Sequence, residues 1–210
     1  MVKKISLTIA RSIGQHQLAD EEQIEVYSYA LELLLGSLLK IVMLLLISGL
    51  LNILYPTMLG TISFAGIRFF GGGVHLSTYY RCLAGSLIIL LILGKVATYN
   101  MDPHFLMPAF FVIFMCGIYS IIRWVPAGTE KKMIIDRESR LKQKIKAMIF
   151  LISCFVVIIV FLYCKLYTFA NGVAYGLVGA IFFITPLGFL MIESIDRLLD
   201  FIIKPVCSKN

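Results

Sequence analysis

Charged residues are scarce in this 210-residue chain. Lysine, arginine, aspartate and glutamate together make up 15% of it, whereas a soluble domain usually carries about 25%. Apolar residues make up 60% and gather in runs long enough to cross a bilayer. This composition excludes an ordinary soluble domain. We expect an all-α, polytopic integral membrane protein whose first partner is the lipid bilayer.

Closely spaced metal ligands are also missing from the sequence. It contains no Cys-x-x-Cys motif and no His/Cys cluster with metal-site spacing, so neither a metal nor a cofactor is expected. The five cysteines are odd in number and three lie within apolar runs, which argues against a disulfide framework. The start of the chain lacks the apolar core and cleavage site of a signal peptide. No nucleic-acid partner is expected.

The apolar runs predict about six transmembrane helices in a single membrane domain over residues 1–210. The expected spans lie near residues 31–54, 56–70, 83–99, 104–122, 147–166 and 172–192. The second span is the shortest, and its small residues suit close helix packing. An amphipathic segment, residues 1–30, precedes the spans, with isoleucines every four residues at Ile5, Ile9 and Ile13.

The distribution of basic residues predicts the orientation. All but three of the 19 lysines and arginines fall in segments that face one side when both chain ends are cytoplasmic. The loop over residues 68–82 and the basic loop over residues 123–146 then face the cytoplasm. Before the first span, Asp20 and Gln23 have the spacing of a capping box, which indicates a helix start. A binding role for this acidic run is the alternative.

The stretch "GIRFFGGGVHLSTYYRC", residues 66–82, holds most of the chemistry of the chain. Cys82 follows Arg81 and lies near an expected helix start, where Ser77 or Thr78 could be the N-cap. A neighbouring positive charge and a helix N-terminus both favour thiolate over thiol. His75, in the same loop, completes a candidate Cys–His pair. The alternative is that this histidine only packs at the membrane interface.

The spacing between His75 and Cys82 limits the local structure. Seven residues of continuous helix would separate the two side chains by about 10.5 Å along the axis, whereas a general base must come within about 3 Å of its nucleophile. We therefore expect a turn or re-entrant loop over residues 71–78 and a helix that begins near 78–81. Gly71 to Gly73 either form this turn alone or also present backbone N–H groups to an oxyanion.

Three stretches together resemble the accessory gene regulator B (AgrB) family of Gram-positive bacteria. They are "RFFGGGVH" with a cysteine seven residues after the histidine, "EVYSYALELLLG" at the first span, and "RWVPAGTEKKMI" after the fourth. The similarity covers about residues 20–193. The resemblance implies a multi-pass cysteine endopeptidase of the bacterial cytoplasmic membrane, with its active site facing the cytoplasm.

The resemblance also implies a reaction, a partner and a set of residues. Such proteins cut the C-terminal tail from an AgrD-like amphipathic precursor peptide and help to convert the remainder to a cyclic thiolactone or lactone. The catalytic residues fall on His75 and Cys82, and a homodimer is plausible. The supporting residues for the oxyanion or the substrate are Arg68, Gly72, Gly73 and Glu32.

Two of these assignments keep an alternative. Arg68 either stabilises an oxyanion or a carboxylate, or only anchors the helix at the interface. The basic loop either reflects membrane topology alone or also attracts the acidic tail of the precursor. The residues expected to dock the tail are Lys131, Lys132, Arg137 and Arg140.

A small transporter or channel with a glycine-rich re-entrant loop is the main alternative function, since broken helices mark ion sites in such proteins. A non-enzymatic membrane scaffold is another. A protease needs Cys82, whereas a transporter or a scaffold should tolerate its loss.

Overall fold

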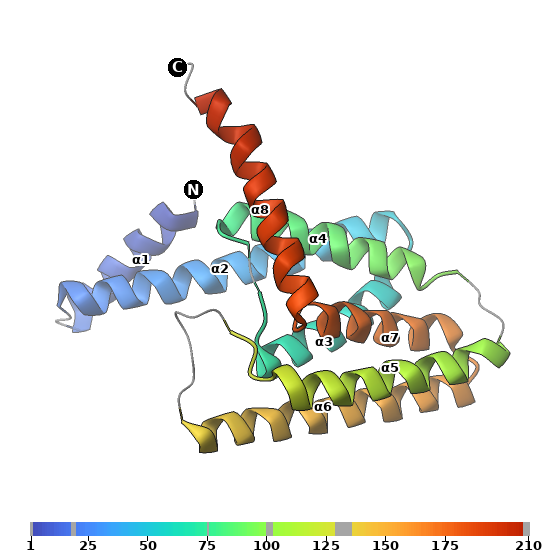
Figure 1. The fold of residues 1–210 in the computed structure, drawn as a ribbon. Helices are drawn as coiled ribbons and strands as arrows, with labels where there is room; N and C mark the ends of the chain where they lie inside the picture. Colours follow the sequence, from blue (N-terminus) through green and yellow to red (C-terminus); the bar gives the residue numbers. More distant parts are fainter. Residues whose placement is uncertain (1, 18–19, 75, 100–102, 129–135, 208–210) are drawn as a thin grey trace. The chain divides into compact units, whose positions relative to one another are not determined.

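The computed structural model describes residues 2–17, 20–74, 76–99, 103–128 and 136–207. The described chain is α-helical apart from one isolated bridge between residues 72 and 127, which confirms the expected all-α class. The helices are α1 (Val2–Gln17), α2 (Glu21–Leu50), α3 (Leu54–Gly71), α4 (Tyr79–Val96), α5 (Pro103–Trp124), α6 (Arg137–Tyr163), α7 (Tyr167–Phe182) and α8 (Pro186–Cys207) (Figure 1).

The chain divides into two compact units, Met1–Ile47 and Ser48–Asn210. In the first unit, one face of α1 exposes the three isoleucines of the expected amphipathic segment, Ile5, Ile9 and Ile13. The helix start before the first span is confirmed. The Asp20 N–H donates to Gln23 Oε1 at 3.2 Å, and the Gln23 N–H donates to Asp20 Oδ1 at 2.7 Å. This reciprocal pair is a capping box.

Within the described residues, four helices are long and apolar enough to cross a membrane: α2, α4, α5 and α6. They overlap the expected spans near 31–54, 83–99, 104–122 and 147–166. The number rises to five when α7 and α8 are taken together as one bent span. The protein is therefore a polytopic membrane protein, and the six-span count and the orientation of its ends stay predictions.

The last expected span, residues 172–192, is not one straight helix. α7 ends at Phe182, α8 begins at Pro186, and the two axes differ by 78°. Proline has no backbone N–H and is favoured at the first position of a helix, so a new helix begins there. The Thr185 hydroxyl group donates to the Phe182 carbonyl oxygen at 2.7 Å, which satisfies one of the groups that the break exposes. Figure 1 shows α8 leaving α7 at a steep angle.

α3 and α7 form the most extensive helix contact among the described elements of the second unit. A Cβ atom placed on Gly176 would lie 2.1 Å from Ser63 Oγ and 2.2 Å from the Gly60 carbonyl oxygen. Ser63 Oγ also donates to the Val173 carbonyl oxygen at 3.0 Å. The expectation that residues 56–70 serve close helix packing is confirmed. α5 and α6 run side by side next to α7 (Figure 1), and the C-terminal end of α3 leads into the glycine run.

Candidate active site

The loop between α3 and α4 has the predicted form. α3 ends at Gly71 and α4 begins at Tyr79, so the expected turn and the expected helix start are both confirmed. Thr78 is the N-cap residue, although its side chain makes no cap hydrogen bond. Cys82 is half-buried in the first turn of α4, and its N–H donates to the Thr78 carbonyl oxygen at 3.0 Å. His75 lies outside the described residues.

The glycine run adopts a backbone that other residues rarely allow. Gly72 has φ of 76° and Gly73 has φ of 130°, both in the region that favours glycine. The Gly72 N–H donates to the Arg68 carbonyl oxygen at 2.9 Å, and the Gly73 N–H donates to the Ala127 carbonyl oxygen at 2.7 Å. In this conformation both N–H groups hold the turn.

A second segment of the chain docks on these glycines. The Ala127 N–H donates to the Gly71 carbonyl oxygen at 2.8 Å, which completes a short parallel bridge with the bond from Gly73. A Cβ atom on Gly72 would lie only 2.0 Å from the Ala127 carbonyl oxygen. Ala127 follows α5 at the start of the expected basic loop. The structure thus joins two motifs that the sequence presents 55 residues apart.

Arg68 reaches from α3 over the loop. Its guanidinium group donates to the carbonyl oxygen of Val74, the residue before His75. The same group lies 5.8 Å from the Phe64 ring centroid and 5.9 Å from that of Phe183, within cation–π range. Cys82 is close enough for an electrostatic interaction with this group when the thiol is ionised. Arg68 therefore places a positive charge near the candidate nucleophile and fixes the backbone next to the candidate base.

The other end of the loop is bound to α8. Asp196 Oδ2 accepts from the Ser77 N–H at 2.8 Å, and Asp196 Oδ1 accepts from Ser77 Oγ at 3.1 Å. Arg81 Nη1 lies 3.3 Å from Asp196 Oδ1 and 2.8 Å from Asp200 Oδ1. The charge of Arg81 is thus compensated by two carboxylates. The expectation that Arg81 acts on its neighbour Cys82 stays a prediction.

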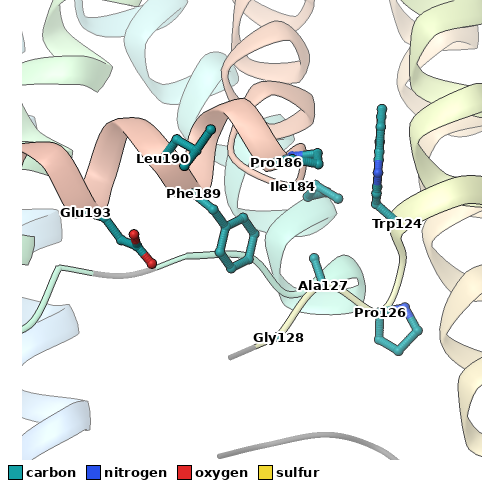
Figure 2. A pocket seen from close by; sticks show the side chains of 9 residues that line it. All are labelled: Trp124, Pro126, Ala127, Gly128, Ile184, Pro186, Phe189, Leu190 and Glu193. Carbon is teal, nitrogen blue, oxygen red and sulfur yellow. The ribbon is translucent and has the colours of Figure 1, made fainter. Parts of the chain in front are cut away.

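An apolar cavity of about 490 Å³ lies beside the Ala127 segment. Figure 2 shows the side chains that line it, with the Glu193 carboxylate at one end. Its wall comes from the end of α5, the segment that follows it, and the turn into α8. The lining residues are Trp124, Pro126, Ala127, Gly128, Ile184, Pro186, Phe189, Leu190 and Glu193.

The remaining predicted residues lie elsewhere. Glu32 is half-buried in α2, in the first unit, and its role stays a prediction. Lys131 and Lys132 lie outside the described residues. Arg137 and Arg140 are exposed in the first turns of α6, so the helix begins well inside the expected loop 123–146.

An N-cap explains this early start of α6. The Asp136 carboxylate accepts from the Ser139 N–H at 2.9 Å and from Ser139 Oγ at 2.7 Å. These hydrogen bonds hold the pKa of Asp136 below its usual range, and the bond from the Ser139 side chain contributes most. The sequence LKQKIKA that follows is rich in good helix formers.

None of the four cysteines whose side chains the structure describes forms a disulfide, and they differ in their surroundings. Cys154 is buried in the core, whereas Cys116 is exposed on α5 and Cys164 is exposed at the C-cap of α6. Cys82 is the one that stands at a helix start beside an arginine. Within the described ranges, no three His, Cys, Asp or Glu side chains are grouped to hold a metal ion.

Fold and site together define a multi-pass helical membrane protein with a cysteine held at a helix start. The family model described as accessory gene regulator B matches residues 6–187. The chain therefore belongs to the AgrB family, whose members process the precursor of an autoinducing peptide. No curated protein and no solved structure matches the chain.

Proposed function

We propose that this protein is a membrane cysteine endopeptidase that cleaves the C-terminal tail of an AgrD-like autoinducer precursor and promotes its cyclisation through a thioester on Cys82. The observation that carries this proposal is the position of Cys82. It stands in the first turn of α4, just after the break that follows His75 in the sequence, and Arg68 reaches over the same loop from α3. A cation beside a thiol at a helix N-terminus favours the nucleophilic thiolate.

The chemistry follows from the two side chains. His75 takes the proton from Cys82 Sγ, and the sulfur attacks the scissile carbonyl carbon. The C–N bond then breaks, His75 returns its proton to the leaving amine, and the body of the peptide remains as a thioester on Cys82. A thiol or hydroxyl group of the same peptide displaces Cys82 and closes the ring. A thiol exchanges one thioester for another, so that ring closure needs little additional driving force.

The geometry of the loop supports specific roles for its neighbours. The turn allows His75 to approach Cys82, which a continuous helix would prevent. Gly72 and Gly73 shape the turn, because their N–H groups already donate to Arg68 and Ala127. An oxyanion role for these two N–H groups is not part of the proposal. Arg68 holds the backbone at Val74 and places a positive charge at the loop.

The surroundings of the loop fit an amphipathic peptide with an acidic tail. The Ala127 bridge places the start of the basic segment next to the glycine run. The basic residues expected to dock the tail follow further along the chain: Lys131, Lys132, Arg137 and Arg140. Basic side chains attract an acidic tail. The apolar cavity beside Ala127 has room for apolar side chains of the peptide. The positive-inside distribution supports a cytoplasmic site, and a homodimer stays a prediction from the family.

The test uses purified protein in liposomes with a precursor peptide that carries an acidic tail. Intact mass spectrometry would follow tail release and the peptide adduct on the protein. We expect both in wild type and in the control Cys116→Ala, and neither in Cys82→Ala. His75→Ala should lose tail release by at least about 100-fold, as removal of a general base does. Normal processing by Cys82→Ala would overturn the proposal and favour a transporter or scaffold.

A further inference from the structure

The loop that carries His75 is held from two sides. Before His75, the backbone is held by Arg68 and by the bridge to Ala127. After His75, the contacts come from α8, at the other end of the sequence. Asp196 binds both the backbone N–H and the hydroxyl group of Ser77, two residues after the histidine.

The same carboxylate also binds the residue before the nucleophile. Arg81 lies between Asp196 and Asp200 and precedes Cys82 in α4. The Arg81 and Asp196 side chains are only 13% and 17% exposed, so the pair is largely shielded from solvent, whereas Asp200 is 55% exposed. Shielding strengthens an ion pair and restricts its side chains to one arrangement.

We infer that Asp196 is a positioning residue of the peptidase, which holds the backbone that follows His75 against the first turn of α4 by binding Ser77 and Arg81 at once. This inference rests on the proposed function. One side chain joins the backbone on the histidine side to the first turn of the cysteine helix, and its loss leaves between them the longer contact of Arg81 Nη1 with Ser77 Oγ, at 3.4 Å. A displacement of about 1 Å between reacting groups can reduce a rate by about 100-fold.

A purely structural ion pair between α4 and α8 makes a different prediction. It would lower the amount or the thermal stability of the folded protein, with the catalytic rate of each folded molecule unchanged. A positioning role lowers kcat, leaves KM nearly constant, and changes how the reactivity of Cys82 depends on pH, because that dependence reports the neighbouring imidazole.

The experiment compares wild type with Asp196→Ala and Asp196→Asn in liposomes, with Arg197→Gln as the control. Arg197 is the next residue on α8 and its side chain is 82% exposed. We expect Asp196→Ala to lower kcat at least about tenfold, with KM within about twofold. Asp196→Asn should fall between the two, because its amide oxygen still accepts from the Ser77 N–H, while Arg81 keeps Asp200 but loses the second of its two carboxylate partners. The control should match wild type.

A second readout needs no peptide. The rate of Cys82 alkylation by iodoacetamide would be measured against pH by mass mapping, in the same variants and in His75→Ala. We expect the profile of Asp196→Ala to move toward that of His75→Ala, and that of Arg197→Gln to match wild type. If Asp196→Ala does not fold, the kinetic constants and the alkylation profile are both measured on Asp196→Asn. Wild-type kcat and a wild-type profile in the folded variant would overturn the inference.

The two proposals fail in different ways. If wild type does not process the peptide, or if Cys82→Ala processes it, the proposed function fails. The alkylation profiles still decide whether Asp196 orders the loop in that case. If wild type is active and Asp196→Ala is equally active per folded molecule, only the inference about Asp196 fails.

Discussion

Two groups of glycines serve different purposes in this protein. At the contact between α3 and α7, Gly60 and Gly176 let two helix backbones come together within the apolar core. In the loop after α3, Gly72 and Gly73 let a turn form hydrogen bonds with the Ala127 segment. In both places a Cβ atom would collide with a carbonyl oxygen.

The difference between the two places lies in what the missing side chain allows. At the helix contact, close approach increases packing between apolar elements, and the Ser63 hydroxyl group adds one bond across it. In the loop, the glycines also adopt positive φ angles, so that their backbone groups turn toward Ala127. The first group supports the fold as a whole, and the second shapes the turn that bonds to the Ala127 segment. Substitutions should separate these roles.

Gly176→Ala should have the largest effect on stability. The added methyl group would overlap Ser63 Oγ and the Gly60 carbonyl oxygen, so α3 and α7 must move apart. We expect a loss of about 3 kcal/mol in the free energy of unfolding, the upper end for overpacking. Thermal unfolding in detergent measures it. The matched control is Gly49→Ala in α2, where nothing lies within 4 Å; equal melting temperatures for the two variants would contradict the prediction.

Gly72→Ala should separate activity from stability. Its methyl group would meet the Ala127 carbonyl oxygen, and its φ of 76° is unfavourable for alanine. The bridge to Ala127 should break while the helix core remains. We expect tail release to fall by about 100-fold with a smaller change in melting temperature than in Gly176→Ala. If Gly72→Ala melted at a lower temperature than Gly176→Ala and still processed the peptide at the wild-type rate, the prediction would be contradicted.

Arg68→Lys tests the link between the loop and the nucleophile. Lysine keeps the positive charge but loses the planar group that lies over Phe64 and Phe183 and donates to Val74. We expect a loss of about tenfold in kcat, the effect of one misplaced charge-assisted hydrogen bond. Arg68→Gln should lose more, because the charge near Cys82 also disappears. Equal rates for the lysine and glutamine variants would show that the charge has no part.

Asp136→Ala should have the smallest effect. The hydrogen bonds from Ser139 lower the pKa of Asp136 in the folded state, so this group stabilises the start of α6 above its unfolded pKa. That contribution is lost as the pH falls below about 4. We expect a slightly lower melting temperature at pH 7 and a weaker dependence on acid pH than in wild type. Melting curves between pH 3 and pH 7 would measure both, and unchanged peptide processing at pH 7 is the internal control.

Local features of the fold followed from the sequence. The break between His75 and Cys82 was predictable, because a continuous helix would hold two residues seven positions apart too far from each other to form a Cys–His pair. The capping box at Asp20 and Gln23 was predictable because its partners are three residues apart. The break at Pro186 was signalled by the proline and missed because the apolar run continues through it.

Contacts between distant residues could not be read in this way. The bridge from Gly71 and Gly73 to Ala127 joins backbone N–H and carbonyl groups. Every residue type except proline carries both groups, so the sequence does not indicate which of them pair. Asp196 looks like one more solvated charge near the end of the chain, and only the fold brings it to Ser77. Arg81 precedes Cys82 in the sequence, but only the fold shows that it pairs with two carboxylates of α8.

The bond between Ser77 and Asp196 spans 119 residues of chain. A ribosome makes the loop, Cys82 and three further helices, α5 to α7, before it makes the carboxylate that binds Ser77 and Arg81. A nascent chain that has inserted α4 but not α8 therefore carries Cys82 without this tether. Under the inferred role of Asp196, the order of synthesis delays completion of the site until the last helix has joined the bundle.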